Sequence, residues 1–218
     1  MDNHGFEKLV WGKMDYQEAL LGMRARHAAR VAGECPDALI LVEHPPVFTC
    51  GKAGGRDNVV LTDEELARDG FGLFHVERAG DVTYHGPGQA IVYPVVDLRA
   101  RRLGVRGLLE AVAGSISEVV ASYGVTAAWD DKNPGVWTSE GRKIAAVGLA
   151  IPEKVSMHGL ALNVNTNLDH FRLIRACGLE AESTSLAREL GRPVDLAEVQ
   201  ERLFASLVRL MVEQGEKA

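Results

Sequence analysis

Three apolar segments follow one another in the middle of the chain with only short turns between them, and this pattern restricts the fold most. Residues 134–138 and 143–151 are separated by Ser139-Glu140-Gly141. Residues 160–164 follow a second turn at Pro152-Glu153-Lys154. Turns this short join antiparallel strands, because a parallel pair needs a long crossover connection. The sequence therefore predicts hairpins within a sheet and argues against a doubly wound parallel sheet.

Helical patterns flank these strands. Apolar residues recur at helical spacing after Asp15, between residues 108 and 120, and after Asp195. Thr62 and Glu65 predict a capping box at the start of a short helix. Further strands are predicted at residues 38–42, 47–49, 72–77 and 90–98. We predict an α+β fold, a mixed sheet flanked by helices, in one domain over residues 1–218, with room for a small C-terminal subdomain at 179–218.

The charge balance narrows the range of partners. The 218 residues include 24 Lys and Arg against 30 Asp and Glu, a net charge of −6, which argues against general binding to nucleic acid or anionic membranes. The 3 cysteines are too few for a disulfide framework, and no Cys-x-x-Cys pair indicates a metal site. With no secretory signal and no apolar stretch of membrane-spanning length, we predict a cytoplasmic protein with reduced thiols.

The segment over residues 78–89 is the densest chemical signal. It places Arg78, Tyr84 and His85 among three glycines and a proline, between two predicted strands. Glycines let backbone N–H groups approach a ligand closely, so this loop could shape a pocket. A purely structural surface turn remains the alternative.

Four further positions combine reactive side chains with informative surroundings. Lys143 enters a strand of small and apolar residues, where burial would lower the pKa of its ammonium group toward that of a usable base. An exposed lysine at the end of a hairpin is the alternative. Cys177 is either a nucleophile or a small core residue. His44 and His158 are candidates for a pocket or for polar turns.

A run of four arginines carries positive charge in an otherwise acidic chain. Such a run is usually a solvated edge, but it also offers a docking surface for an acidic partner. The residues are Arg99, Arg101, Arg102 and Arg106.

Several motifs, taken in order, resemble those of the lipoyl (octanoyl) transferases over residues 39–212. They are Glu43-His44-Pro45-Pro46-Val47-Phe48-Thr49, residues 78–89 with Tyr93-Pro94, Pro134-Gly135-Val136-Trp137, Arg142-Lys143-Ile144, residues 158–165, and Cys177-Gly178. Ala79, Ala176 and Asn167 depart from the family's common residues, which puts loop geometry in doubt but removes no reacting atom.

The resemblance implies a fold similar to the catalytic domains of biotin and lipoate protein ligases. It also implies transfer of an octanoyl group from octanoyl-acyl carrier protein to one lysine of a lipoyl domain, without a cofactor. Cys177 would form the acyl thioester and Lys143 would be its acid/base partner. The substrate-binding residues implied are Arg78, Ala79, Gly80, Asp81, Val82, Thr83, Tyr84, His85, Ala146, Val147, Gly148, Gly159, Leu160 and Ala161.

The acceptors implied are lipoyl domains of 2-oxoacid dehydrogenase complexes and of the glycine cleavage system. Two other functions stay open. A ligase of the same fold would activate its acid with ATP and would need no cysteine nucleophile. A non-catalytic module would only dock acyl carrier or lipoyl domains, and would need neither the thiol nor the amine.

Overall fold

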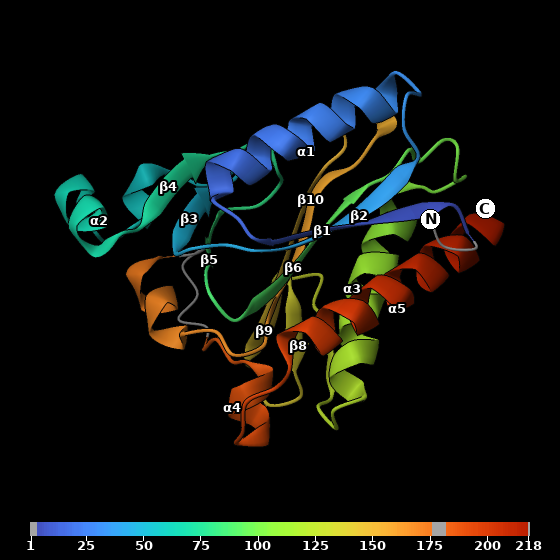
Figure 1. Ribbon diagram of the computed structural model, residues 1–218. Helices are drawn as coiled ribbons and strands as arrows, with labels where there is room; N and C mark the ends of the chain where they lie inside the picture. Colours follow the sequence, from blue (N-terminus) through green and yellow to red (C-terminus); the bar gives the residue numbers. More distant parts are fainter. Residues whose placement is uncertain (1–3, 176–181, 218) are drawn as a thin grey trace.

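The computed structural model describes residues 4–175 and 182–217 of the 218-residue chain (Figure 1). A large sheet has seven strands in the order β1-β2-β6-β10-β9-β8-β7, and a small sheet has three in the order β4-β3-β5. The large sheet contains β1 (Phe6–Lys13), β2 (Asp37–Glu43), β6 (Gln89–Val95), β7 (Ala127–Trp129), β8 (Val136–Thr138), β9 (Lys143–Ala150) and β10 (Met157–Asn163). The small sheet contains β3 (Val47–Cys50), β4 (Gly72–His75) and β5 (Val82–His85).

Both sheets are mixed. In the large sheet β1 pairs with β2 in parallel, and β2, β6, β10, β9, β8 and β7 pair antiparallel in turn. In the small sheet β3 pairs in parallel with β4 and antiparallel with β5. The predicted α+β class with a mixed sheet is confirmed, and so is the hairpin that joins β8 to β9.

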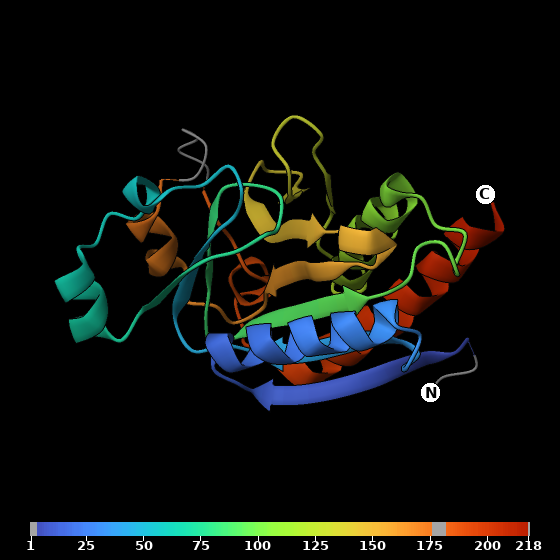
Figure 2. The ribbon, with the colours of Figure 1, turned by 90° about the horizontal axis from the view of Figure 1, so that it is seen from above.

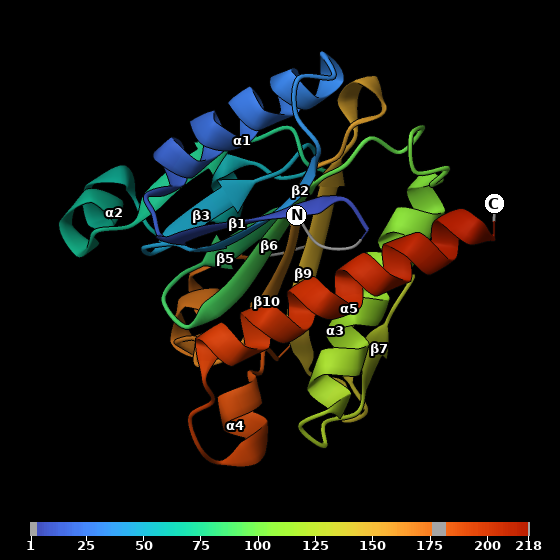
Figure 3. The ribbon, with the colours of Figure 1, turned by 45° about the vertical axis from the view of Figure 1, so that its right-hand side comes forward.

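Helices cover the large sheet on both faces (Figure 3). The α-helices are α1 (Tyr16–Val31), α2 (Asp63–Asp69), α3 (Val105–Ala121), α4 (Leu186–Leu190) and α5 (Leu196–Glu216). Short 3-10 turns are η1 (Arg56–Asn58), η2 (Pro152–Lys154) and η3 (Leu168–Leu173). In Figures 1 and 3, α1 lies on one face of the large sheet, and α3 and α5 lie side by side on the other face.

The sequence explains why these helices bury the faces that they do. In α3, Leu108, Val112, Ile116 and Val119 recur at helical spacing and are fully or almost fully buried. They join α5 and one face of the sheet in the largest apolar cluster. Tyr16, Leu20 and Met23 of α1 form a second cluster against the other face. The predicted capping box of Thr62 and Glu65 is present at the start of α2.

Three strands are absent from the prediction. β1 is an edge strand whose residues are mostly half-buried or exposed, so its apolar pattern is weak. β7 has only 3 residues. β5 lies inside the segment that was expected to be a loop. Gly80 and Gly86 on either side of it are typical turn residues, so the sequence favours a loop there. In the structure Val82–His85 forms a strand by pairing with β3.

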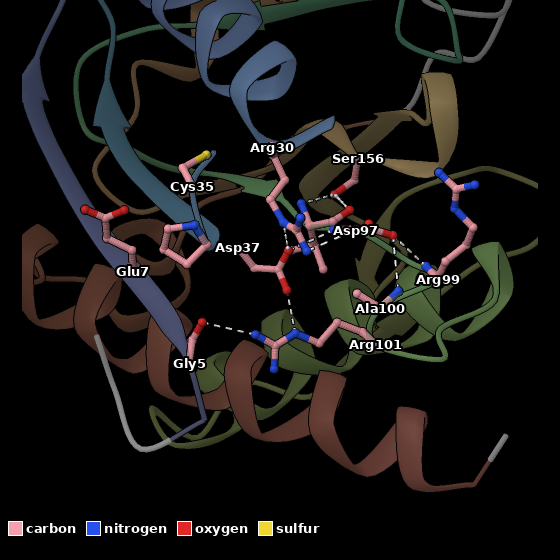
Figure 4. A network of polar contacts seen from close by, with 12 residues as sticks. Gly5, Glu7, Arg30, Cys35, Asp37, Asp97, Arg99, Ala100, Arg101 and Ser156 are labelled. Atoms are coloured by element: carbon pink, nitrogen blue, oxygen red, sulfur yellow. Dashed lines mark hydrogen bonds and ion pairs between the residues drawn. The ribbon is translucent and has the colours of Figure 1, made fainter. Parts of the chain in front are cut away.

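Asp37, at the start of β2, ties the layers together through a buried carboxylate (Figure 4). Its side chain is 2% exposed and accepts hydrogen bonds from Arg30 Nε at 2.7 Å and Arg101 Nε at 2.5 Å. It also accepts from the backbone N–H of Asp97 at 2.9 Å. Helix α1, strand β2 and the segment after β6 therefore meet at one carboxylate.

We expect Asp37→Asn to lower the free energy of unfolding by about 3 kcal/mol, because it removes the buried anion that Arg30 and Arg101 share and leaves Arg30 only the longer contact of 3.8 Å to Asp97. Urea denaturation measures the change. The control is Glu110→Gln, which removes the partner of Arg106 in a pair with side chains 90% and 47% exposed. The control should cost less than about 0.5 kcal/mol. Equal losses in the two variants would contradict a structural role for the Asp37 network.

Candidate functional site

A cavity of about 1040 Å³ lies where the small sheet meets β9 and β10 of the large sheet. Its wall brings together segments that are far apart in the sequence: residues 80–83 at β5, 145–148 in β9, 158–161 in β10, and η3. All of the predicted substrate-binding residues except Ala79 and Tyr84 line it, as do Lys143 and His158. The sequence motifs therefore converge on one site.

Small residues form a flat part of this wall. In the β9–β10 ladder Ala146 is opposite Ala161, and Gly148 is opposite Gly159. Opposite residues of an antiparallel pair, and those two positions along, share one face, so the four form a patch with almost no side chains. A Cβ on Gly159 would lie 2.2 Å from the carbonyl oxygen of Val92. Glycine is thus required there by the packing of β6.

The side chain of Arg78 lies against the patch at Gly148. It is 8% exposed, and its Nη2 donates to the carbonyl oxygen of Thr49 at 2.6 Å and to the Thr49 hydroxyl at 3.0 Å. A Cβ on Gly148 would lie 2.9 Å from Arg78 Cδ, so the missing side chain makes space for the arginine. Burial lowers the pKa of Arg78 from its ordinary value. The cavity therefore has a buried cationic group held by neutral oxygen atoms.

Lys143 begins β9 at the edge of the cavity. Its Nζ donates to the carbonyl oxygen of Pro134 at 2.9 Å and lies 5.4 Å from the centre of the Trp137 ring. Gly135 has φ +152°, and a Cβ there would lie 2.5 Å from Lys143 Cε. The turn before β8 thus comes close enough to fix the lysine only because it contains a glycine.

The chain that follows Cys177 returns beside Lys143. The backbone N–H of Lys143 donates to the Glu182 carbonyl at 2.9 Å, and the N–H of Thr184 donates to the Lys143 carbonyl at 2.9 Å. Arg142 holds the same segment through two hydrogen bonds to Glu189, of 2.9 and 2.7 Å. Cys177 itself lies outside the described residues.

Buried aromatic and polar groups form the inner end of the cavity. His85 Nδ1 donates to Gln89 Oε1 at 2.8 Å, and Gln89 Nε2 donates to Asn163 Oδ1 at 2.9 Å. Burial lowers the pKa of His85 to about 3, with the nearby His44 contributing in the same direction. Burial likewise lowers the pKa of His158 to about 4. Both rings are therefore neutral at pH 7.

His44 is placed behind the wall rather than in it. Its Nδ1 donates to the Met14 carbonyl at 2.8 Å, and its Nε2 lies 2.8 Å from the Tyr93 hydroxyl. Burial lowers the pKa of the His44 ring, so the neutral Nε2 accepts the proton of Tyr93. His44 thus orients Tyr93, which does line the cavity. Of the two histidine candidates, only His158 lines the cavity.

Two residues of the predicted binding loop have structural contacts instead. Tyr84 is fully buried against Phe48, and its hydroxyl is 2.7 Å from His170 Nδ1, which fixes η3 to β5. The N–H of Ala79 donates to the Leu149 carbonyl at 2.9 Å, which ties the loop to β9. Neither lines the cavity, and a role for these two residues in substrate binding stays a prediction.

Several lining residues were given no role by the sequence. Tyr16 looked like an ordinary core position of α1, and nothing local distinguishes it. Asn163 and Pro134 lie within the motifs that resemble the family, and that position could have identified them as site residues. Further lining residues of this kind are Gln89, Tyr93, Lys132, Asn133, Trp137, Leu168 and Phe171.

The arginine run lies away from this cavity. None of Arg99, Arg101, Arg102 and Arg106 is among the lining residues. Arg101 is engaged with Asp37, and Arg106 with Glu110 at 2.8 Å. In Figures 1 and 2 this segment lies at the end of the molecule opposite η3. The run therefore lies outside the cavity wall and includes a structural ion pair, and its role as a docking surface stays a prediction.

Within residues 4–175 and 182–217, no group of three or more His, Cys, Asp or Glu side chains is arranged to hold a metal ion. Nor does any helix in the described part have the length and apolar character needed to cross a membrane.

Comparison with known proteins identifies the family. The profile of the lipoyl protein ligase A/B catalytic domain matches residues 15–208. The chain belongs to this family. It is 45% identical over 201 residues to an octanoyltransferase of Myxococcus xanthus, covering 89% of this chain and 56% of that protein. It is 42% identical over 193 residues to an octanoyltransferase of Bacteroides fragilis (strain YCH46), covering 86% and 87%. The family predicted from the motifs is confirmed, and with it an acyltransferase enzyme.

Solved structures with the same fold are more distant in sequence. Lipoate-protein ligase A, in a crystal structure with bound ATP, has a TM-score of 0.75 and 14% identity, covering 95% of this chain and 85% of that one. Biotin protein ligase from Aquifex aeolicus has a TM-score of 0.56 and 13% identity, covering 98% and 73%. At this identity the likeness shows the fold alone, and it confirms the expected relation to ligase catalytic domains.

The neutral histidines predict a loss of stability in mild acid. The unfolded chain binds a proton at each histidine below about pH 6.5, whereas His85 and His158 stay neutral in the fold down to about pH 3 and 4. The free energy of unfolding therefore falls as pH falls from 6.5 to 5. Each residue contributes a slope of about 1.4 kcal/mol per pH unit.

His158→Asn tests this expectation, because asparagine tolerates the positive φ of 58° at this position. Urea unfolding at several pH values should give a shallower slope for the variant between pH 6.5 and 5. The ring signals of His158 in NMR spectra of the unmutated protein should show no protonation in the same interval. A slope identical in both proteins, or a ring that titrates near pH 6.5, contradicts the expectation.

Proposed function

We propose that this protein is an octanoyltransferase, which moves an octanoyl group from octanoyl-acyl carrier protein to one lysine of a lipoyl domain. Cys177 carries the group as a thioester, and Lys143 is the acid/base partner. The names of the Myxococcus and Bacteroides relatives support the activity. The acceptors are lipoyl domains of 2-oxoacid dehydrogenase complexes and of the glycine cleavage system.

One observation carries this proposal. Arg175 and Glu182, which bracket the segment containing Cys177, both line the cavity that Lys143 lines. Glu182 also accepts a hydrogen bond from the backbone of Lys143 at 2.9 Å. A thiol two positions after Arg175 and a lysine beside Glu182 are the pair that a thioester mechanism needs.

The two half-reactions balance without a cofactor. The neutral amine of Lys143 takes the thiol proton of Cys177, and the thiolate attacks the thioester carbonyl of the carrier. The carbon–sulfur bond to the carrier breaks, and its thiolate leaves with the proton from Lys143. In the second half, the neutral amine of the acceptor lysine attacks the acyl-enzyme and gives a proton to Lys143. The amide forms, and the Cys177 thiolate leaves and recovers that proton.

The patch of small residues provides the place for the acyl chain. Ala146, Gly148, Gly159 and Ala161 line the cavity together with residues of the loop at 78–85, and the slot for the acyl chain runs along them. Burying about six methylenes there, at roughly 0.8 kcal/mol each, contributes on the order of 5 kcal/mol to binding. An apolar slot of this kind suits a saturated chain better than a polar substrate.

The proposal includes a cytoplasmic location. A nucleophilic thiol has to stay reduced, and glutathione and thioredoxin keep thiols reduced in that compartment. The ATP-dependent ligase reaction is the competing activity for this fold. Its substrates are free octanoate and ATP instead of an acyl thioester.

The decisive experiment is incubation with octanoyl-acyl carrier protein, followed by mass spectrometry of the intact protein. We expect an increase of one octanoyl group, lost in Cys177→Ala and kept in the control Cys35→Ala. Lys143→Ala should acquire the group at least about 100-fold more slowly, because it removes the general base. Lys52→Ala, which changes an exposed lysine outside the cavity, should react normally.

The outcomes separate the candidates. An adduct that survives in Cys177→Ala removes that residue from the mechanism, and a normal rate in Lys143→Ala removes the base. Pyrophosphate release from ATP with free octanoate, in the absence of any adduct from the carrier, would instead support the ligase reaction.

The slot predicts a change in acyl preference when it is narrowed. Ala146→Val adds two methyl groups to the patch, so we expect the ratio of octanoyl to hexanoyl transfer to fall about tenfold. The control is Ala128→Val, on the exposed side of β7. Rates with the two acyl carriers measure the ratio. An unchanged ratio in Ala146→Val would mean that the chain binds elsewhere.

A further inference from the structure

The charge of the cavity wall is opposite to that of the whole chain. The described lining residues include six basic side chains and three acidic ones, Asp81, Asp169 and Glu182. The whole chain has 24 basic residues and 30 acidic ones. Of the six, Arg78 is buried and Lys143 is half-buried, while the other four are exposed. These four form what we call the basic rim: Lys132, Arg172, Arg175 and Arg188.

The rim has uncompensated positive charge. Arg188 is paired with Glu182, and Arg172 lies 3.6 Å from Asp169 in a pair whose side chains are 85% and 78% exposed. Within residues 4–175 and 182–217, Lys132 and Arg175 form no ion pair within 4 Å, although Asp130 and Asp131 precede Lys132 in the same loop. Residues that both line a cavity and remain exposed lie at its mouth, so the surplus charge is at the entrance.

The rim comes from three separate parts of the chain. Lys132 lies in the loop before β8, Arg172 and Arg175 lie in and just after η3, and Arg188 lies in α4. Asp130 and Asn133 hold the first loop through a hydrogen bond of 3.0 Å, and Tyr84 holds η3 through His170. The cationic side chains therefore project from supported backbone on several sides of one opening.

We propose that the basic rim is the docking surface for the acidic protein that delivers the acyl group. This inference rests on the proposed function and adds the surface and the charge that recognise the donor. A carrier with an excess of acidic residues is attracted to the mouth although the chain as a whole has a charge of −6, because exposed charges act mainly within about 10 Å.

Charge reversal tests the rim. The variant Lys132→Glu/Arg172→Glu changes two exposed side chains from different elements and leaves Arg175, close to Cys177, unchanged. The matched control is Lys13→Glu/Arg99→Glu, with the same charge change at two exposed residues that do not line the cavity. Two measurements are made on each protein: binding of fluorescently labelled acyl carrier protein, and acyl transfer from the carrier compared with octanoyl-pantetheine.

For the rim variant we expect binding of the carrier, and kcat/KM with the carrier, to fall about tenfold or more at low salt. The loss with octanoyl-pantetheine should be much smaller than the loss with the carrier, since that donor has no acidic protein surface. In about 0.5 M salt the difference from the unmutated protein should largely vanish. The control variant should bind and react like the unmutated protein.

Four results would overturn the docking assignment. They are unchanged carrier binding in the rim variant, an equal loss with the carrier and with octanoyl-pantetheine, an equal loss in the control, and a rise in KM confined to the lipoyl domain. Failure of the proposed function looks different. In that case the unmutated protein would transfer no octanoyl group from either donor, while carrier binding would still report on the rim.

Discussion

The antiparallel pairing of β9 with β10 is the contact on which the rest of the site depends. It sets Ala146 opposite Ala161 and Gly148 opposite Gly159, so a surface almost free of side chains is produced in the middle of a seven-stranded sheet. The loop at residues 78–85 can then approach, with the N–H of Ala79 donating to Leu149 of β9. A shift of one residue in this register would turn the larger neighbours toward the cavity and remove the slot.

The same ladder also positions the reactive end of the site. Lys143 is the first residue of β9, and its backbone pairs with β8 on one side and with Glu182 and Thr184 through hydrogen bonds. Strand β9 therefore connects three parts of the site: the Lys143 side chain, the slot, and the chain at Glu182 and Thr184. This is why Gly135 matters: the turn before β8 supplies the Pro134 carbonyl to Lys143 only because no Cβ stands between them.

Local patterns predicted the parts of the fold that depend on local physics. Short turns identified the β8–β9 hairpin, and helical spacing identified α1, α3 and α5. β1 and β5 were missed because their stability comes from partners far along the chain, β2 and β3, and not from their own pattern. The site divides in the same way. Motif residues such as His158 and Gly159 could be anticipated, whereas Tyr16 reaches the cavity wall only through the packing of α1 on the sheet.

The distribution of charge follows from burial. Inside the cavity, desolvation keeps His85 and His158 neutral, and the buried Arg78 donates its hydrogen bonds to the neutral oxygen atoms of Thr49. At the mouth the cations are exposed, where water lowers the cost of their charge and leaves them able to attract an acidic protein. A net charge of −6 therefore does not determine which macromolecule the protein meets. What matters is which charges the fold leaves exposed beside the opening, and these come from segments that only the folded chain brings together.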